Sequence, residues 1–558
     1  MVKMNSSRFL PDRIEQMKEP VFLFFLFLAS LIFRLPTLFN DYYDVDELAA
    51  IVQTKEYLAG FIPGIDFKES KLPLYHAIFK FSYDLNAACG WVIVHAVTIL
   101  FVFLTALSVY YIGRLVRDRR TGITASLLYA VLISSFNRHF MATNGEVIYN
   151  LPVTAGLLFF IVILKSRSWL LRVICAVLAA FSMYAAVMVK VHGSILLLFV
   201  IFFLLIYLPY YKRFLRRLVL PYALIIAAAV IVTVLDFYIT KKFAPGMTKS
   251  VRELLFYAIF GRSINPLNMI AIYSYKQLTI GIWHIVLWIP AAVYIFRYIK
   301  NGFRRETLEE SATALFTLIT FMMVFSGGAR LYYHYFMTSY PLLCVTAAIA
   351  LVSFESPAVK KIRNNFTAAI LIPGLFFLCW NFKDIYIKYF NQDLFYNEPA
   401  PAFWFRAVVV SSMDDYLLPG NSYRNTVDYI RKNTSPSDTI FVWGDGPHLY
   451  YFSDRRIAIQ HVWPKGSAIQ MERSYRSGNP LLVAEAEAEQ RGYIIEMEKK
   501  KPALFIDTSP KGLFRSVTKL GDFAKFPYDV PPVIREYLDR HYSLQAVVDD
   551  FKIYRRIK

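Results

Sequence analysis

The sequence has little cysteine, and several kinds of motif are missing from it. Four of the 558 residues are cysteine, and they lie in or beside apolar runs, at Cys89, Cys175, Cys344 and Cys379. This placement predicts neither a disulfide framework nor a cysteine-bound zinc cluster. The chain also has no internal repeat, low-complexity tract or glycine-rich phosphate loop, which excludes repeat architectures and nucleotide binding by such a loop.

Hydrophobic residues, in contrast, are abundant. They make up 56% of the chain, and the mean hydropathy is +0.41, above the roughly half-apolar composition of a soluble domain. About eleven apolar runs of roughly 17 to 23 residues are each long enough to cross a bilayer as a helix. They lie near residues 21–38, 91–113, 122–138, 147–165, 171–189, 193–210, 218–236, 279–297, 311–327, 336–353 and 365–381. The sequence therefore predicts a polytopic α-helical membrane protein.

The loops between these runs alternate in charge, which predicts an orientation. Basic residues concentrate in every second loop, at 114–120, 165–172, 210–217, 297–306 and 359–364. The positive-inside rule places these loops and the N-terminus in the cytoplasm. The long loops 39–90 and 237–278 then lie outside, and an odd number of spans leaves the C-terminal tail outside as well. Because the net charge of +20 resides mainly in short inner loops, we expect contact with anionic lipids and no nucleic-acid partner.

The apolar runs stop near residue 381, and the remaining residues have the composition of a soluble domain. We therefore expect a transmembrane domain over 1–381 and an extracytoplasmic domain over 382–558. The pattern predicts helices at 421–433 and 480–500, strands at 435–444 and 502–509, and a final hairpin that turns at Asp549 and Asp550. Such alternation is typical of an α/β domain.

The first outer loop begins with a cluster of acidic residues. Its four carboxylates are Asp41, Asp44, Asp46 and Glu47. We expect an interfacial helix to follow, with these residues on its lipid side: Leu48, Ile51, Val52 and Leu58. A partly desolvated carboxylate here can act as a general base. It can equally stabilise a helix N-terminus without any catalytic role, and both interpretations stay open.

The same loop continues with basic and aromatic residues, and here a family resemblance emerges. "KLPL" at 71–74 resembles the "KPPL" signature of GT-C membrane glycosyltransferases, and Asp46-Glu47 resembles their "DE" pair. This family includes the protein O-mannosyltransferases and the lipid A aminoarabinose transferases. Three further segments are similar to the family in the same order: 137–160 with Glu146, "VKVHGS" at 189–194, and 327–343 with its Arg, Tyr and His residues. All of them fall outside under the orientation given above.

The resemblance implies an inverting glycosyltransferase with a GT-C fold, which takes its sugar from a polyprenyl-phosphate donor at the outer membrane face. It implies four catalytic carboxylates: Asp46 as the first candidate base, Asp44 as its competitor, Glu47, and Glu146, which orients the acceptor. The donor phosphate would be bound by cationic residues, Lys71 and Arg330 first, with His334 and Lys190 behind them. Residues lining the donor and acceptor sites would be Tyr43, Tyr75, His76 and Tyr333. Interfacial snorkelling and an ordinary aromatic belt remain the alternative interpretation of these cations and tyrosines.

The resemblance leaves cofactor, acceptor and sugar only partly specified. No cofactor is required, because lysine and arginine can stabilise a phosphate leaving group; Mg²⁺ or Mn²⁺ held by the carboxylates is possible but not expected. The acceptor is a hydroxyl of a protein, lipid or glycan. We expect the location to be a bacterial inner membrane. The alternatives are a lipid or sugar transporter or flippase, which would carry polar residues near the middle of its spans, and a scaffold presenting its soluble domain.

Overall fold

The computed structural model describes most of the chain as two compact units. The described residues are 10–40, 43–61, 67, 71–135, 138–210, 280–324, 333–390, 424–444, 446–462, 480–508, 530–549 and 551–557. One unit comprises residues 1–43, 71–243 and 251–385, and the other comprises 44–70, 244–250 and 386–558. The expected outer loop 237–278 and the expected span 218–236 lie outside the described residues.

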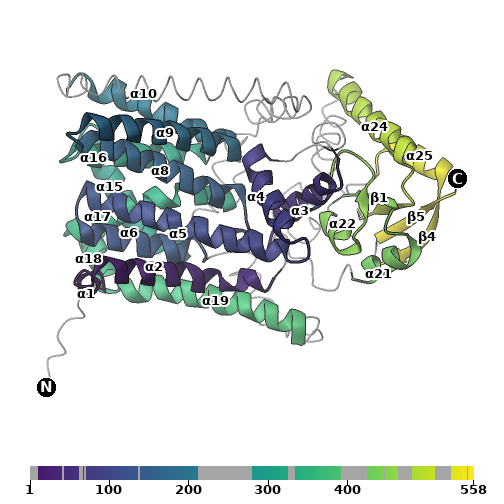
Figure 1. Cartoon of the computed structure of the whole chain (residues 1–558), viewed down its shortest axis with the longest axis horizontal. Helices are drawn as coiled ribbons and strands as arrows, with labels where there is room; N and C mark the ends of the chain where they lie inside the picture. The colour runs from purple at the N-terminus through teal and green to yellow at the C-terminus, as the bar shows by residue number, and fades with distance from the viewer. Residues whose placement is uncertain are drawn as a thin grey trace. The chain divides into compact units, whose positions relative to one another are not determined.

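The first unit is helical, and its long helices lie roughly side by side (Figure 1). Its longer helices are α2 (Glu19–Arg34), α4 (Pro73–Leu85), α5 (Gly90–Val116), α6 (Arg119–Leu132), α8 (Gly145–Lys165), α9 (Trp169–Val189), α10 (Ile195–Tyr207), α15 (Ile285–Lys300), α16 (Leu308–Met323), α17 (Tyr340–Ser353) and α19 (Phe366–Phe390). Shorter elements connect them: α1 (Leu10–Ile14), η1 (Leu35–Leu38), α7 (Arg138–Met141), η2 (Val191–Ser194), η3 (Tyr333–Ser339) and α18 (Pro357–Asn364).

The helices confirm a multi-span membrane protein but not the expected number of spans. Among the described residues, five helices are long and apolar enough to cross a membrane, or six if the bent pair Pro357–Asn364 and Phe366–Phe382 forms one span. Four of the other expected spans are helices of 13 to 16 residues, namely α6, α10, α15 and α16. These are shorter than the about 20 residues that a straight crossing needs.

Three of the basic loops meet at one end of the helical unit. The amine of Lys165, the last residue of α8, donates a hydrogen bond to the Leu115 carbonyl at 2.6 Å. Arg117 lies 3.8 Å from Glu310, which also pairs with Arg305 at 2.9 Å. Glu146 is in the first turn of α8, so it lies a whole helix length, about 30 Å, from this basic end.

The second unit contains a five-stranded mixed sheet in the order β2-β1-β3-β5-β4. The strands are β1 (Thr439–Trp443), β2 (Arg456–Ile457), β3 (Leu504–Asp507), β4 (Tyr542–Val548) and β5 (Phe551–Arg556). β1 pairs in parallel with β2 and β3, whereas β5 runs antiparallel to β3 and β4. The helices are α3 (Val45–Leu58), α21 (Arg424–Asn433), α22 (Pro447–Ser453), α24 (Pro480–Lys500) and α25 (Pro532–His541). The helices, strands and final hairpin expected after residue 420 are therefore confirmed.

Alternating side chains of β1 build two separate apolar layers. Ile440 and Val442 point into one cluster, together with residues of α21 and α22. Phe441 and Trp443 point into the other, which also contains residues of α24 and α25, including Tyr493. Because successive side chains of a strand face opposite sides, one buried strand serves both layers.

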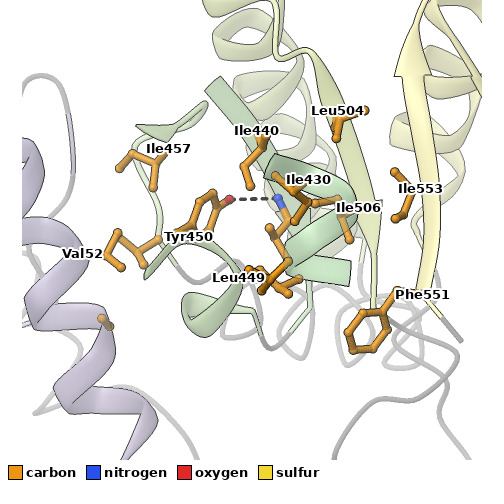
Figure 2. Packing of buried hydrophobic residues seen from close by; sticks show 14 of the residues in the cluster. Val52, Ile430, Ile440, Leu449, Tyr450, Ile457, Leu504, Ile506, Phe551 and Ile553 are labelled. Atoms are coloured by element: carbon orange, nitrogen blue, oxygen red, sulfur yellow. Dashed lines mark hydrogen bonds between the residues drawn. The ribbon is translucent and has the colours of Figure 1, made fainter. Parts of the chain in front are cut away.

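Helix α3 belongs to this second unit, which corrects the expected lipid-facing side. Leu48, Ile51 and Val52 are at most 4% exposed, and Val52 lies in the same cluster as Val442. Figure 2 shows Val52 beside Tyr450 and Ile457. The side of α3 that contains Val52 is therefore covered by protein rather than by lipid. Leu58, at the end of the helix, is 38% exposed.

A buried hydrogen bond in the first layer provides a stability test. The Val442 backbone N–H donates to the Tyr450 hydroxyl at 2.9 Å, and both residues are 1% exposed (Figure 2). Tyr450→Phe leaves this N–H buried without that acceptor, so we expect a loss of about 1–3 kcal/mol in the free energy of unfolding of this unit. Hydrogen exchange of the β1 amides measures it. Tyr493→Phe removes a hydroxyl of the other layer, whose hydrogen bond to Glu489 is only partly buried, and should affect the β1 amides less. Equal exchange in both variants would contradict the assignment.

Candidate functional site

Glu146 is a buried carboxylate at the start of a long apolar helix. It is 3% exposed and lies in the first turn of α8, after the N-cap residue Asn144. The positive end of the helix dipole favours a negative charge in this position. A buried charge nevertheless needs direct partners, because desolvation costs several kcal/mol per ion.

Three basic residues from distant segments surround this carboxylate, and Lys190 is its direct partner. The Lys190 amine donates a hydrogen bond to Oε1 of Glu146, and Nε2 of His334 lies 3.9 Å from the same oxygen. The charge of Lys71 also acts on this carboxylate. Lys190 follows α9, His334 lies in η3, and Lys71 precedes α4. The fold thus brings four of the residues suggested by sequence into one charged cluster.

The turn that carries Lys190 depends on a close backbone approach. The Gly193 N–H donates to the Lys190 carbonyl at 2.8 Å. A Cβ atom at Gly193 would lie 2.2 Å from the backbone nitrogen of Val187, in the last turns of α9. The Tyr149 hydroxyl holds the same turn by donating to the His192 carbonyl at 3.0 Å. Glycine is therefore required here to fold η2 back against α9 and place Lys190 beside Glu146.

A small hollow opens beside Lys190. The residues that line it are Tyr149, Lys190, His192, Ile195, Thr320, Met323, Tyr335 and Thr338. The Lys190 ammonium also lies over the Tyr335 ring, 4.4 Å from its centroid, a geometry that stabilises a cation. The hollow therefore combines apolar and aromatic walls with one fixed positive charge.

A second histidine lies next to His334. The rings of His139 and His334 have centroids 5.7 Å apart, and both residues are less than 10% exposed. Imidazole nitrogens are ligands that Zn²⁺ prefers, whereas Mg²⁺ and Mn²⁺ favour oxygen. These two imidazoles would therefore suit Zn²⁺ better than Mg²⁺ or Mn²⁺.

The segment before Glu146 is held by a buried arginine. Arg34, in the last turn of α2, is 0% exposed. Its guanidinium donates to the carbonyls of Phe140 at 2.9 Å, Met141 at 2.5 Å and Ala142 at 3.5 Å. The Tyr75 hydroxyl donates to the next carbonyl, that of Thr143, at 2.8 Å. Successive carbonyls ahead of α8 are thus tied to α2 and α4, which sets where the helix and Glu146 begin.

The acidic cluster of the first loop forms the start of α3 in the second unit. Asp44 is the N-cap of α3, and its Oδ1 accepts a hydrogen bond from the Asp46 N–H at 3.1 Å. Asp44 and Glu47 are buried at 3% and 0% exposure, and Asp46 is half-buried. The capping interpretation therefore holds for Asp44, and Asp46 follows it in the first turn. Asp41 lies outside the described residues.

The remaining sequence candidates are placed as follows. Arg330 lies outside the described residues. Tyr43, Tyr75 and Tyr333 are buried and are not among the described residues that line the hollow. Tyr43 instead packs against Met141 and Ala142. Tyr75 positions the backbone before Glu146. The lining role expected for the three tyrosines stays a prediction.

Several residues of this region were not recognised from sequence. They are Arg34, His139, Tyr149 and Tyr335. Tyr149 lies one helical turn after Glu146, so helical spacing could have found it. Tyr335 directly follows His334. Arg34 carries a signal too, because an arginine at the end of an apolar run is expensive to bury without a purpose.

The hydrogen bonds of Arg34 provide a test of how Glu146 is positioned. Arg34→Met leaves three buried carbonyls without this donor, and hydrogen bonds to charged groups are each worth about 1.5–3 kcal/mol. We expect a clearly lower melting temperature in nanodiscs and faster hydrogen exchange in residues 139–148. Arg114→Met removes a partly exposed pair with Glu19 at the other end of the bundle and should cost under about 1 kcal/mol. Equal effects would refute the positioning role.

His76 provides a pH test of the same region. Burial, and secondarily the charge of Lys71, lower the pKa of His76 from 6.5 to about 3. In the unfolded chain His76 therefore binds a proton as the pH falls below 6.5, whereas in the folded protein it does so only near pH 3. Stability should be highest above pH 6.5 and fall as the pH drops, by at most about 1.4 kcal/mol per pH unit from this group. Melting temperatures at pH 7 and pH 5 should differ less for His76→Gln than for the wild type; an equal difference would mean that folded His76 is charged.

Comparison with known proteins identifies the fold. No protein-family model and no curated protein matches the sequence. The structure is similar to that of ArnT from Cupriavidus metallidurans bound to undecaprenyl phosphate, with a TM-score of 0.61 and 13% identity over 96% of this chain and 98% of that chain. The apo state of the same ArnT gives a TM-score of 0.56. The oligosaccharyltransferase AglB from Archaeoglobus fulgidus, in complex with an inhibitory peptide and a dolichol-phosphate, gives 0.50 at 12% identity over 88% of this chain and 70% of that chain. The chain is thus a multi-span membrane protein with a GT-C-like fold and a C-terminal mixed sheet.

Proposed function

We propose that this protein is an inverting glycosyltransferase that moves a sugar from a polyprenyl-phosphate donor to a hydroxyl acceptor at the outer membrane face. The observation that carries the proposal is the charged cluster of Glu146, Lys190, His334 and Lys71 at one end of an apolar helical unit. Ionisable residues within membrane segments are costly and usually mark a functional site. Glu146 is such a residue, in the first turn of α8, and three basic residues from other segments lie around it.

The fold supports the donor class. ArnT, which has a similar fold over nearly its whole length, is bound to undecaprenyl phosphate, and AglB is in complex with a dolichol-phosphate. Both ligands are long prenyl chains that carry a phosphate. A donor of this kind resides in the membrane, so an enzyme outside the cytoplasm needs no soluble nucleotide sugar.

The chemistry needs cations on the leaving group. The bond between the anomeric carbon and the phosphate oxygen breaks, and the electron pair stays on the polyprenyl phosphate. Positive groups fixed in advance stabilise this growing charge. Lys71 and Arg330 are the first choices for this role, with His334 and Lys190 behind them.

The acceptor side needs a base. The acceptor hydroxyl forms the new bond to the anomeric carbon from the face opposite the phosphate, which inverts the centre, and its proton passes to a carboxylate. Asp46 is our first candidate, and Asp44, whose Oδ1 caps α3, is its competitor. Glu146, held ionised by its cations, orients the acceptor. No step requires a divalent metal, and we expect turnover to persist in EDTA.

The position of the cluster favours a transferase over a transporter. A transporter or flippase would carry ionisable residues near the middle of its spans. Glu146 instead lies in the first turn of α8, and Lys190 directly follows the last turn of α9. We place this end of the unit outside and the basic end in the cytoplasm, in a bacterial plasma membrane. The sugar and the acceptor, whether protein, lipid or glycan, are for experiment to identify.

The test uses the full chain in nanodiscs with a panel of polyprenyl-phosphate sugars. Mass spectrometry records whether any donor loses its sugar to water or to an added acceptor. Lys71→Ala and Glu146→Gln should each lower turnover of the accepted donor about 10²- to 10³-fold, the usual cost of one preorganised contact. Asp46→Asn should lower it at least as much, because it removes the base.

A matched control is available in the same helical unit. Glu310 is also a buried carboxylate paired with a cation, Arg305, but it lies at the basic end. Glu310→Gln should leave turnover per folded protein within a few-fold of the wild type. If no donor is turned over or bound, or if Glu310→Gln costs as much as Glu146→Gln, the transferase proposal fails.

A further inference from the structure

The acid-bearing helix α3 is packed into the C-terminal domain by its apolar side. Ala49, Val52 and Phe67 lie in the same apolar cluster as Val442 of β1 and Ile457 of β2. Figure 2 shows Val52 directed toward this cluster. The first outer loop therefore completes one layer of a domain that begins more than 300 residues later in the chain.

A buried carboxylate fixes this packing. Glu56, one turn after Val52 on the same side of α3, is 5% exposed. Its Oε1 accepts a hydrogen bond from the Ile457 N–H at 3.1 Å, and its Oε2 lies 3.3 Å from the Arg456 guanidinium. β2 is one of the two edge strands of the sheet, so Glu56 accepts from a backbone donor at the sheet edge. The hydrogen bond to the edge strand fixes which residue of β2 lies opposite Glu56, and the charge of Arg456 favours an acidic residue in this position.

Two weaker contacts surround Glu56. Lys55 pairs with Asp454 at 2.7 Å on the surface, where a salt bridge is worth little. Arg456 lies over the Phe61 ring, 3.8 Å from its centroid, so the residue that pairs with Glu56 also holds the chain after α3. The hydrogen bond from the Ile457 N–H to Glu56 is buried and directional, so it adds to the apolar packing of α3 a contact that specifies one arrangement.

The attachment has a consequence for the other end of α3. The helix has 14 residues, about 21 Å, and a helix of this length is rigid. Asp46 lies in its first turn, three residues before Ala49. An anchor at Ala49, Val52 and Glu56 therefore fixes both the direction and the rotation of the end that carries Asp46.

We propose that the C-terminal domain is a positioning module for α3, and that Glu56 is the positioning residue that aligns Asp46 for proton removal. This inference rests on the proposed transferase function only for the role of Asp46; the docking of α3 through Glu56 stands independently.

The experiment measures docking and catalysis separately in the full chain in nanodiscs. Glu56→Ala leaves the buried Ile457 N–H and Arg456 without their acceptor. Hydrogen exchange in residues 45–58 should rise at least tenfold, while exchange in α24 stays unchanged. With the donor accepted by the wild type, kcat should fall about 10- to 100-fold, because a displacement of about 1 Å at a reacting group can cost 10²-fold. KM for the donor should stay within about twofold.

Two further variants separate positioning from general damage. Glu56→Gln keeps an acceptor for the Ile457 N–H and should restore most of the exchange protection and of kcat. Glu498→Ala removes a carboxylate of the same domain that pairs with Arg556 at 3.4 Å, in helix α24 on the other side of the sheet. It should leave exchange in α3 and kcat unchanged.

Each result decides part of the inference. Unchanged exchange in Glu56→Ala overturns the docking role of Glu56. Faster exchange in α3 with an unchanged kcat overturns the positioning role, as does a loss confined to KM. If the wild type turns over no donor, the proposed function fails, and the exchange data still decide whether Glu56 docks α3.

Discussion

A buried carboxylate in an apolar helical unit must be paired, and this constraint organises the end of the molecule that contains Glu146. The carboxylate draws Lys190, His334 and Lys71 toward one point from three separate segments. The three segments that carry these residues therefore come together near the first turn of α8, where Glu146 lies. Arg34 and Tyr75 donate hydrogen bonds to buried backbone carbonyls ahead of Glu146, which also need partners. The same basic residues that we propose act on a phosphate also interact with Glu146, so they contribute to the folding of these segments as well as to function.

The C-terminal domain solves a similar problem at Glu56. This carboxylate is also almost fully buried, and it is satisfied by a backbone N–H and a guanidinium of an edge strand. In each unit one buried carboxylate, Glu146 or Glu56, binds donors from a segment that is distant in sequence. Such contacts are directional, so they select one arrangement, whereas apolar packing such as that of Val52 is non-directional.

Local pattern explains which elements could be predicted. In the C-terminal domain the helix at Pro480–Lys500 and the strands at Thr439–Trp443 and Leu504–Asp507 follow from periodicity and turn residues, which act over a few neighbours. The apolar runs likewise predict membrane helices. Their number could not be predicted with the same security, because length and hydropathy do not distinguish a full span from a shorter buried helix such as α6.

The sequence by itself determined the multi-span helical class and the α/β character of the C-terminal domain, because these follow from composition and periodicity, which are properties of neighbouring residues. The candidate residues Glu146, Lys190, His334 and Lys71 were suggested by the resemblance of short motifs to a known family, and their roles stay predictions. Only the tertiary structure decided that Lys190 is the direct partner of Glu146, and that α3 packs into the C-terminal domain rather than against lipid. The physical reason is that an amphipathic face and a buried charge specify the kind of partner they require, but its identity depends on segments hundreds of residues away.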